Sequence, residues 1–184
     1  MTGIASKSQL RMSFLRYALV TVPGVLLAGT LSGQLAGAGA GNRWFEALAK
    51  PGFMLPGWAF GLGWTILYVL LGLVLAMLLH ARGARGRGRV LGLFALQLAM
   101  NLAWSPLFFA WHEVGAALSL IAAMVVVTAA LIVLVWRIRP VGAALLIPYL
   151  AWLIFAAALN FEISRLNPDA EALVPGSAST DIQL

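Results

Sequence analysis

Aromatic and amide side chains recur at helical spacing in three apolar stretches of the chain. Residues three or four positions apart share one face of a helix, so each set forms a stripe that points in a single direction. Buried indole N–H groups, amides and aromatic faces suit the binding of a flat, mostly apolar ligand with a few polar edges. The three stripes are Phe60, Trp64 and Tyr68; Gln97, Asn101, Trp104 and Phe108; and Tyr149, Trp152, Ala156 and Asn160.

The elements that must position these stripes are membrane helices. Hydrophobic residues make up 62% of the 184 residues and charged residues only 10%, with a mean hydropathy of +0.95. A soluble domain averages roughly 45–50% apolar and about 25% charged residues. So few charges cannot solvate a globule of this size, which indicates an integral membrane protein. The membrane also explains the net charge of +6 better than nucleic acid does, and we expect no nucleic-acid partner.

Five apolar runs are each close to the ~20 residues needed to cross ~30 Å of hydrocarbon. Lipid requires backbone polar groups to be satisfied within each segment, so the runs are helices. The prediction is an all-α integral membrane protein, a bundle of five transmembrane helices within residues 17–164. Residues 1–16 form a cytoplasmic N-terminal segment, and 165–184 form a disordered polar tail. The expected helices are about 17–40, 57–80, 90–110, 115–136 and 141–163.

The loop at residues 42–56 is expected to cover the aromatic stripes as a lid. Pro51 and Pro56 lack an N–H donor and disfavour helix in the residue before them, so they hold the loop extended. Trp44 and Lys50 belong to the same loop. By depth along the helices, Trp64, Trp104 and Trp152 fall below this lid, in the outer half of the membrane or near its midplane.

Charge indicates the orientation. A cleaved signal peptide is the alternative interpretation of the first run, but the apolar region of a signal peptide is about 7–15 residues and this run is longer. Five crossings leave Arg43, Lys50, Arg165 and all six acidic residues on one side. The positive-inside rule then predicts a cytoplasmic N-terminus and an external C-terminus, in a bacterial inner membrane. The side rich in positive charge carries Lys7, Arg11, Arg16, Arg82, Arg85, Arg87, Arg89, Arg137 and Arg139.

Several of these residues have simpler structural interpretations. Trp58, Trp111 and Trp136 fall at helix ends, where tryptophan anchors a helix at the membrane interface. Gln97, Asn101 and Asn160 either line a cavity or bridge helices by hydrogen bonds. No metal site is expected, because His80 and the His112-Glu113 pair lack further ligands in sequence. The chain has no cysteine, and no Ser-His-Asp or paired-carboxylate arrangement indicates hydrolysis.

Two stripes of small residues predict close helix contacts. Small side chains let the backbones of two membrane helices approach each other. Either stripe could therefore form the interface of a homodimer, and membrane lipid is the other expected neighbour. The stripes are Ala95, Ala99 and Ala103, on the face opposite Asn101, and Gly29, Gly33 and Gly37 in the first run.

At these residues the sequence resembles the translocator protein family, also called tryptophan-rich sensory proteins or peripheral-type benzodiazepine receptors. The matching pieces lie in order in the first loop and in the second, third and fifth helices. They are RWFEALAKP (43–51), Pro56 with Trp58, Gly61, Trp64, Leu67 and Tyr68, QLAMNLAWSPLFF (97–109) and PYLAWLIFAAALNF (148–161).

The resemblance implies a five-helix bundle, often dimeric, that binds porphyrins such as protoporphyrin IX, synthetic benzodiazepine-type ligands and, in animal members, cholesterol. It implies tetrapyrrole sensing, transport or regulation, with porphyrin as a ligand and no required cofactor. Light- and oxygen-dependent porphyrin degradation is the enzymatic alternative, and Trp64 and Trp152 match the tryptophans of that chemistry. Sterol or lipid binding is a further alternative. Carried over by position, the pocket would include Trp64, Asn101, Trp104, Trp152, Ala156 and Leu159.

The sequence departs from the family pattern at two places. Gly52-Phe53 and Leu55-Pro56 stand where a Ser-Trp pair and a Pro-Pro pair are common, which affects how the lid seats. Phe161 stands where the sterol pattern of animal members has a central tyrosine. Such sterol motifs are weak indicators, and we do not expect a sterol as the natural ligand.

Overall fold

The computed structural model describes residues 7–174, which form helices and connections and contain no strand. The five long helices are long and apolar enough to cross a membrane, which confirms the predicted five-helix bundle. The elements are α1 (Lys7–Leu35), α2 (Arg43–Ala47), α3 (Gly57–His80), α4 (Arg87–Ser105), a π-helical turn η1 (Pro106–Ala110), α5 (Val114–Trp136), α6 (Pro140–Leu166) and a 3₁₀ turn η2 (Ala170–Ala172).

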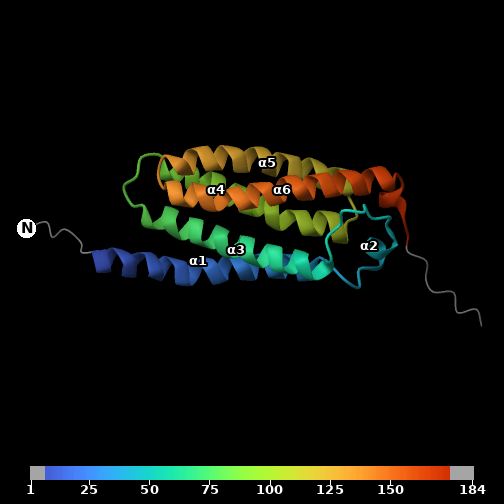
Figure 1. Cartoon of the computed structure of the whole chain (residues 1–184), viewed down its shortest axis with the longest axis horizontal. Helices are drawn as coiled ribbons and strands as arrows, with labels where there is room; N and C mark the ends of the chain where they lie inside the picture. The colour runs from blue at the N-terminus through green and yellow to red at the C-terminus, as the bar shows by residue number, and fades with distance from the viewer. Residues whose placement is uncertain (1–6, 175–184) are drawn as a thin grey trace, which may run out of the picture.

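The long helices lie side by side and run alternately up and down (Figure 1). Contacts place α1 between α3 and α4, α6 between α3 and α5, and α5 between α6 and α4. The beginning of α1 and the α3–α4 and α5–α6 connections lie at one end of the bundle. The short helix α2 and the end of α6 lie at the other. The arginine-rich connections are therefore at the end opposite the lid, as five crossings require.

The first helix differs from the expected 17–40. It begins at Lys7, because the polar residues before Tyr17 continue the helix beyond the apolar run. It ends at Leu35 because Gly37, Gly39 and Gly41 adopt positive φ values of 66°, 108° and 94°, a backbone region that glycine enters at little cost. The glycines at 37–41 therefore form the turn into the lid and do not extend the helix.

The other helix ends also differ from the expected bounds. The expected helix 90–110 begins at Arg87, whose guanidinium donates to the carbonyls of Leu78 and Leu79 at 2.7 and 3.0 Å and so satisfies the last turn of α3. Its last five residues form a π-helical turn that begins at Pro106, which has no N–H to continue an α-helix. The final helix continues to Leu166, with Asn167 at its end.

Small residues set the crossing of α1 and α3. A Cβ atom at Gly72 would lie 2.6 Å from Val22 Cα and 3.1 Å from the Thr21 carbonyl oxygen. The Thr21 hydroxyl donates to the Gly72 carbonyl at 2.8 Å. The two backbones therefore touch at this point, which only glycine permits on the α3 side.

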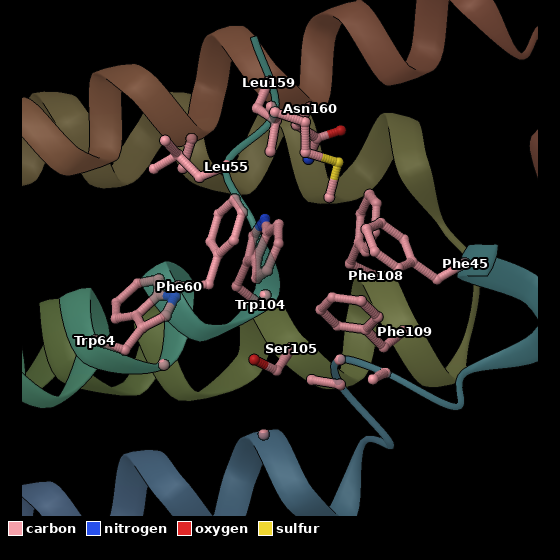
Figure 2. A pocket seen from close by; sticks show the side chains of 18 of the residues that line it. Phe45, Leu55, Phe60, Trp64, Trp104, Ser105, Phe108, Phe109, Leu159 and Asn160 are labelled. Atoms are coloured by element: carbon pink, nitrogen blue, oxygen red, sulfur yellow. The ribbon is translucent and has the colours of Figure 1, made fainter. Parts of the chain in front are cut away.

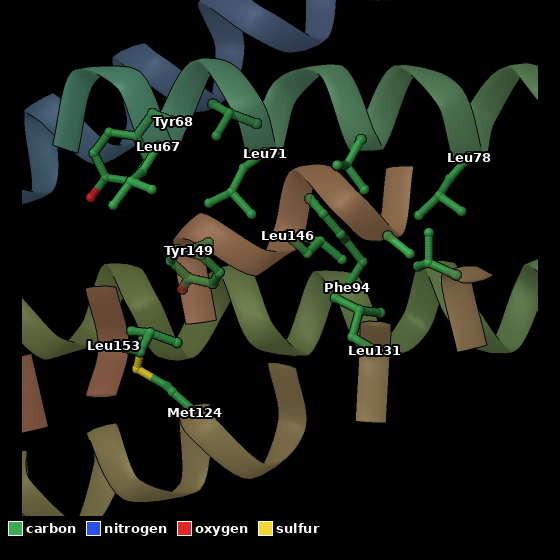
Figure 3. Close-up of a cluster of buried hydrophobic side chains, with 14 of the residues drawn as sticks. Leu67, Tyr68, Leu71, Leu78, Phe94, Met124, Leu131, Leu146, Tyr149 and Leu153 are labelled. Atoms are coloured by element: carbon green, nitrogen blue, oxygen red, sulfur yellow. The ribbon is translucent and has the colours of Figure 1, made fainter. Parts of the chain in front are cut away.

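The core lies below the lid end, where α3, α4, α5 and α6 bring apolar side chains together (Figure 3). Leu78, Leu131, Leu146 and Leu153 have no exposed surface. Tyr149 is also fully buried among them. This packing holds the four helices at fixed positions.

Candidate ligand-binding cavity

A cavity of about 780 Å³ lies under the lid, between the lid-side halves of α1, α3, α4 and α6 (Figure 2). Its volume falls within the roughly 300–1,000 Å³ of small-molecule sites, and its walls are mostly apolar, as such sites usually are. Most of the sequence-predicted site residues line it. These are Phe60, Trp64, Tyr68, Trp104, Phe108, Trp152, Ala156, Leu159, Asn160 and, from the lid, Lys50.

Aromatic rings form two connected walls of the cavity. The rings of Trp64 and Trp152 meet edge to face with centroids 6.0 Å apart, and Trp64 stacks on Tyr68 at 5.4 Å. On the other wall Trp104 stacks on Phe108 at 5.1 Å. The stacking restrains each ring, so the walls are flat and largely preformed.

Two indole N–H groups in these walls have no hydrogen-bond partner. They are the Nε1 groups of Trp104 and Trp152, and both are buried. A buried polar group without a partner costs about 1–3 kcal/mol, and native proteins contain few such groups. The side chains of both tryptophans line the cavity, and their N–H groups are the unpaired donors of its walls.

Asn101 lies beneath the cavity and is not among its lining residues, which differs from the sequence-based expectation. Its side chain accepts a hydrogen bond from the Tyr68 hydroxyl at 3.1 Å and donates to the Tyr149 hydroxyl at 3.0 Å. The Gln97 amide donates to the same Tyr149 oxygen at 2.9 Å. These amides bridge α3, α4 and α6 beneath the cavity, which is the alternative left open for them.

Asn160 both lines the cavity and bridges two helices. It is 1% exposed. With its amide oriented to donate to the Val114 carbonyl, at 3.3 Å, it also accepts from the Leu118 N–H at 3.2 Å. Asn160 therefore ties α6 to the first turns of α5 at the depth of the aromatic walls.

The lid contains the short helix α2, which begins with a well-formed cap. The Asn42 side chain accepts from the Phe45 N–H at 2.9 Å and donates to the Phe109 carbonyl at 3.2 Å. Lys50 donates to the carbonyls of Glu46 and Leu48, both at 3.2 Å. These bonds shape the lid and attach it to the end of η1.

Trp44, Pro51 and Pro56 support the lid without lining the cavity. Trp44 is 2% exposed. Its ring stacks on His112 with centroids 4.3 Å apart, and its indole N–H donates to the Ala170 carbonyl at 2.8 Å. Trp44 therefore attaches the lid to His112 and to the segment after α6.

The segment after α6 is part of this roof, where a disordered tail was expected. The Asn167 side chain accepts from the Ala49 N–H at 2.8 Å and donates to the Ala49 carbonyl at 2.9 Å. The Glu171 carboxylate accepts from the Gly115 N–H at 2.9 Å, which caps the start of α5. Residues 167–172 are held by these bonds although their composition is polar. The rest of the expected tail, 175–184, lies outside the described residues.

Several lining residues were missed by the stripe analysis. Phe45, Met54 and Leu55 come from the lid, whose register no periodicity reveals, and Phe109 comes from the π-helical turn. Others come from α1 and its following turn, and include Gly29, Thr30, Gly33 and Gln34. The rest are Glu46, Gly57, Gly61, Thr65, Ser105 and Ile163. The four-residue glycine spacing of α1 predicts a close helix contact, and at Gly29 the partner is Tyr68 of α3 and not a second subunit.

Comparison with known proteins agrees with this architecture. The model of the TspO/MBR family matches residues 20–166, which include the second half of α1, the other four long helices and the lid. The chain belongs to the TspO/MBR family. The TspO/MBR match and the five apolar helices together make it an integral, multi-pass membrane protein.

TspO/MBR relatives from three domains of life cover most of this chain. It is 39% identical over 149 residues to the translocator protein of Sus scrofa, covering 78% of this chain and 88% of that protein. It is 37% identical over 142 residues to the tryptophan-rich protein TspO of Archaeoglobus fulgidus, covering 77% and 92%. It is 35% identical over 134 residues to the tryptophan-rich sensory protein of Cereibacter sphaeroides, covering 71% and 83%.

Proposed function

We propose that this protein binds porphyrins, such as protoporphyrin IX, in the aromatic cavity under the lid, and that binding serves tetrapyrrole sensing, transport or regulation in the membrane. The observation that carries the proposal is the cavity itself. It is about 780 Å³ in volume, and two indole N–H donors without partners lie in its stacked aromatic walls. A porphyrin supplies a flat apolar ring for the walls and polar edge groups for the donors.

Binding is tested by titrating protoporphyrin IX into the protein in lipid nanodiscs and following both porphyrin absorbance and tryptophan fluorescence. We expect saturable binding. The double variant Trp64→Phe, Trp152→Phe should weaken it about tenfold, because it removes ring area from one wall and one of the unpaired donors; tenfold corresponds to about 1.4 kcal/mol. Absence of saturable binding, or unchanged affinity in the double variant, would refute the proposal.

Trp58→Phe is the matched control. Trp58 is on the same helix as Trp64, but it is 73% exposed and does not line the cavity. The same chemical change there should leave the affinity of the protein for porphyrin within about twofold, since no wall of the cavity is altered. A similar loss in Trp58→Phe would show that the effect is not local to the cavity.

Light- and oxygen-dependent porphyrin degradation is the second candidate, and the contact between Trp64 and Trp152 favours it. Their ring centroids are 6.0 Å apart, so both indoles would lie beside one bound ligand. Illumination of the complex in air should then bleach the porphyrin faster than free porphyrin in the same nanodiscs. The double variant, saturated with ligand, should bleach at the free rate. Equal rates for complex and free porphyrin would reject the activity.

The charges and exposed small residues support two further parts of the proposal. We propose an inner-membrane location with the lid outside, because the arginine-rich connections lie at the opposite end. We propose a homodimer through the exposed alanines of α4 at positions 95, 99 and 103. The glycine stripe is not available for this role, because Gly29 is buried against the Tyr68 ring.

A further inference from the structure

On one side of the cavity, several lining residues of α1 and α3 are also exposed at the surface of the bundle. These helices are neighbours. They touch at Gly72, where the backbone meets Val22, and again where the Tyr68 ring covers Gly29. Nearer the lid, the residues that line this side of the cavity are small or polar. The residues in that stretch are Thr30, Gly33 and Gln34 of α1 and Gly57, Gly61 and Thr65 of α3.

The glycines of this stretch have no atom of the facing helix within 4 Å of their Cβ positions. A Cβ atom at Gly61 would have no neighbour within 4 Å. At Gly33 the nearest atom, 3.9 Å away, belongs to Ala38 of the following turn and not to α3. Gly61 and Thr65 lie roughly 6 and 12 Å along α3 from its first residue, at ~1.5 Å per residue. The opening is therefore at a depth where the surrounding solvent is hydrocarbon.

Hydrogen bonds hold neighbouring elements together at other sides of the cavity. The Ser32 hydroxyl of α1 donates to the Leu102 carbonyl of α4 at 2.6 Å. The lid is bonded to the segment after α6 through Ala49 with Asn167 and through Trp44 with Ala170. At the opening itself the Thr65 hydroxyl donates to the Gly61 carbonyl at 2.7 Å. Because that hydroxyl is satisfied within α3, it places no unpaired donor in contact with lipid.

We propose that ligands reach the cavity from the hydrocarbon layer, through the gap between α1 and α3, and not through the lid. This inference rests on the proposed function in that it concerns the same cavity, and it restricts the ligand class. Molecules that dissolve in the bilayer are admitted, whereas water-soluble analogues of the same shape are excluded. Figure 2 shows Ser105 of α4 inside the cavity, between the Trp64 side chain and α1, and it provides a reporter position for this route.

The route is tested by thiol labelling in nanodiscs, without any porphyrin. The chain has no cysteine, so Ser105→Cys carries a single thiol inside the cavity. Two maleimides are compared, one that partitions into the bilayer and one charged and confined to water. Each rate is normalised to that of Ala49→Cys, an exposed position on the lid. We expect the bilayer-soluble reagent to label Ser105→Cys at least about tenfold faster than the charged one after normalisation.

Blocking the gap identifies the path. Gly61→Phe, added to Ser105→Cys, should slow labelling by the bilayer-soluble reagent several-fold. Gly24→Phe should not, because Gly24 is exposed on α1 with no neighbour within 4 Å of its Cβ position. Equal normalised rates for the two reagents, or no effect of Gly61→Phe, would overturn the inference. These outcomes are independent of the porphyrin titration, so failure of the route and failure of the proposed function are distinguishable.

Discussion

Replacement of Gly72 by leucine is expected to disrupt the packing of α1 on α3 and to lower the free energy of unfolding by roughly 3 kcal/mol or more. A side chain at this position meets backbone atoms of Val22, with Cβ 2.6 Å from its Cα and 3.0 Å from its N. Backbone atoms of a neighbouring helix cannot move aside as a side chain does. Separation of the helices would also break the bond between the Thr21 hydroxyl and the Gly72 carbonyl.

Gly24→Leu is the control for this prediction. Both substitutions replace a helical glycine by leucine and so gain the same intrinsic helix propensity, about 0.8–1 kcal/mol. Gly24 has no neighbour within 4 Å of its Cβ position, so its variant should be as stable as the parent or slightly more stable. Thermal unfolding in detergent, followed by circular dichroism, measures both. Equal midpoints for the two variants would contradict the assignment of this contact.

Tyr149→Phe is expected to destabilise the bundle by roughly 2–3 kcal/mol. The substitution keeps the ring but removes the oxygen that accepts from Gln97 and Asn101 at 2.9 and 3.0 Å. Those amides are 1% and 4% exposed, and each donor left unpaired costs about 1–3 kcal/mol. Interhelical hydrogen bonds in membranes average a smaller value, ≈ 0.6 kcal/mol, which keeps the expected sum near the lower end.

Variants of the other two tyrosines should show smaller losses of stability in the same unfolding assay. Tyr68→Phe removes one donor to the Asn101 oxygen, so we expect about half the loss. Tyr17 contacts Arg82 at the exposed end of the bundle, and Tyr17→Phe should cost under about 1 kcal/mol. A ranking in which Tyr17→Phe equals Tyr149→Phe would show that the buried network does not contribute as the geometry indicates.

The helices and two walls of the cavity could be predicted, because the length of an apolar run and its helical periodicity can both be read from the sequence alone. Trp64, Trp104 and Trp152 line the cavity because each lies on a face that the helix period already defines. Asn101 shares its stripe with Trp104 but lies one turn deeper, where the Tyr68 and Tyr149 hydroxyls engage it. Periodicity determines a direction around the helix, but it does not determine which level is filled by a neighbouring helix.

The segment after α6 and the α1 wall could not be predicted, because no repeating pattern assigns either of them to the cavity. Asn167 and Ala170 belong to a polar segment whose composition is typical of disorder, yet single hydrogen bonds to Ala49 and Trp44 hold it in place. The glycines of α1 fit two partners equally well in sequence, a second subunit or α3. Only the position of the Tyr68 ring against Gly29 distinguishes them.

The bond between Trp44 and Ala170 joins residues 126 positions apart, and this separation orders events during synthesis. Trp44 leaves the ribosome and reaches the membrane surface long before Ala170 has been translated. The lid can be bonded to the segment after α6 only once that segment has been synthesised, which is after every membrane helix has been translated. A nascent chain that stops before Asn167 retains all five helices and their aromatic walls, but the bonds that fasten the lid are missing.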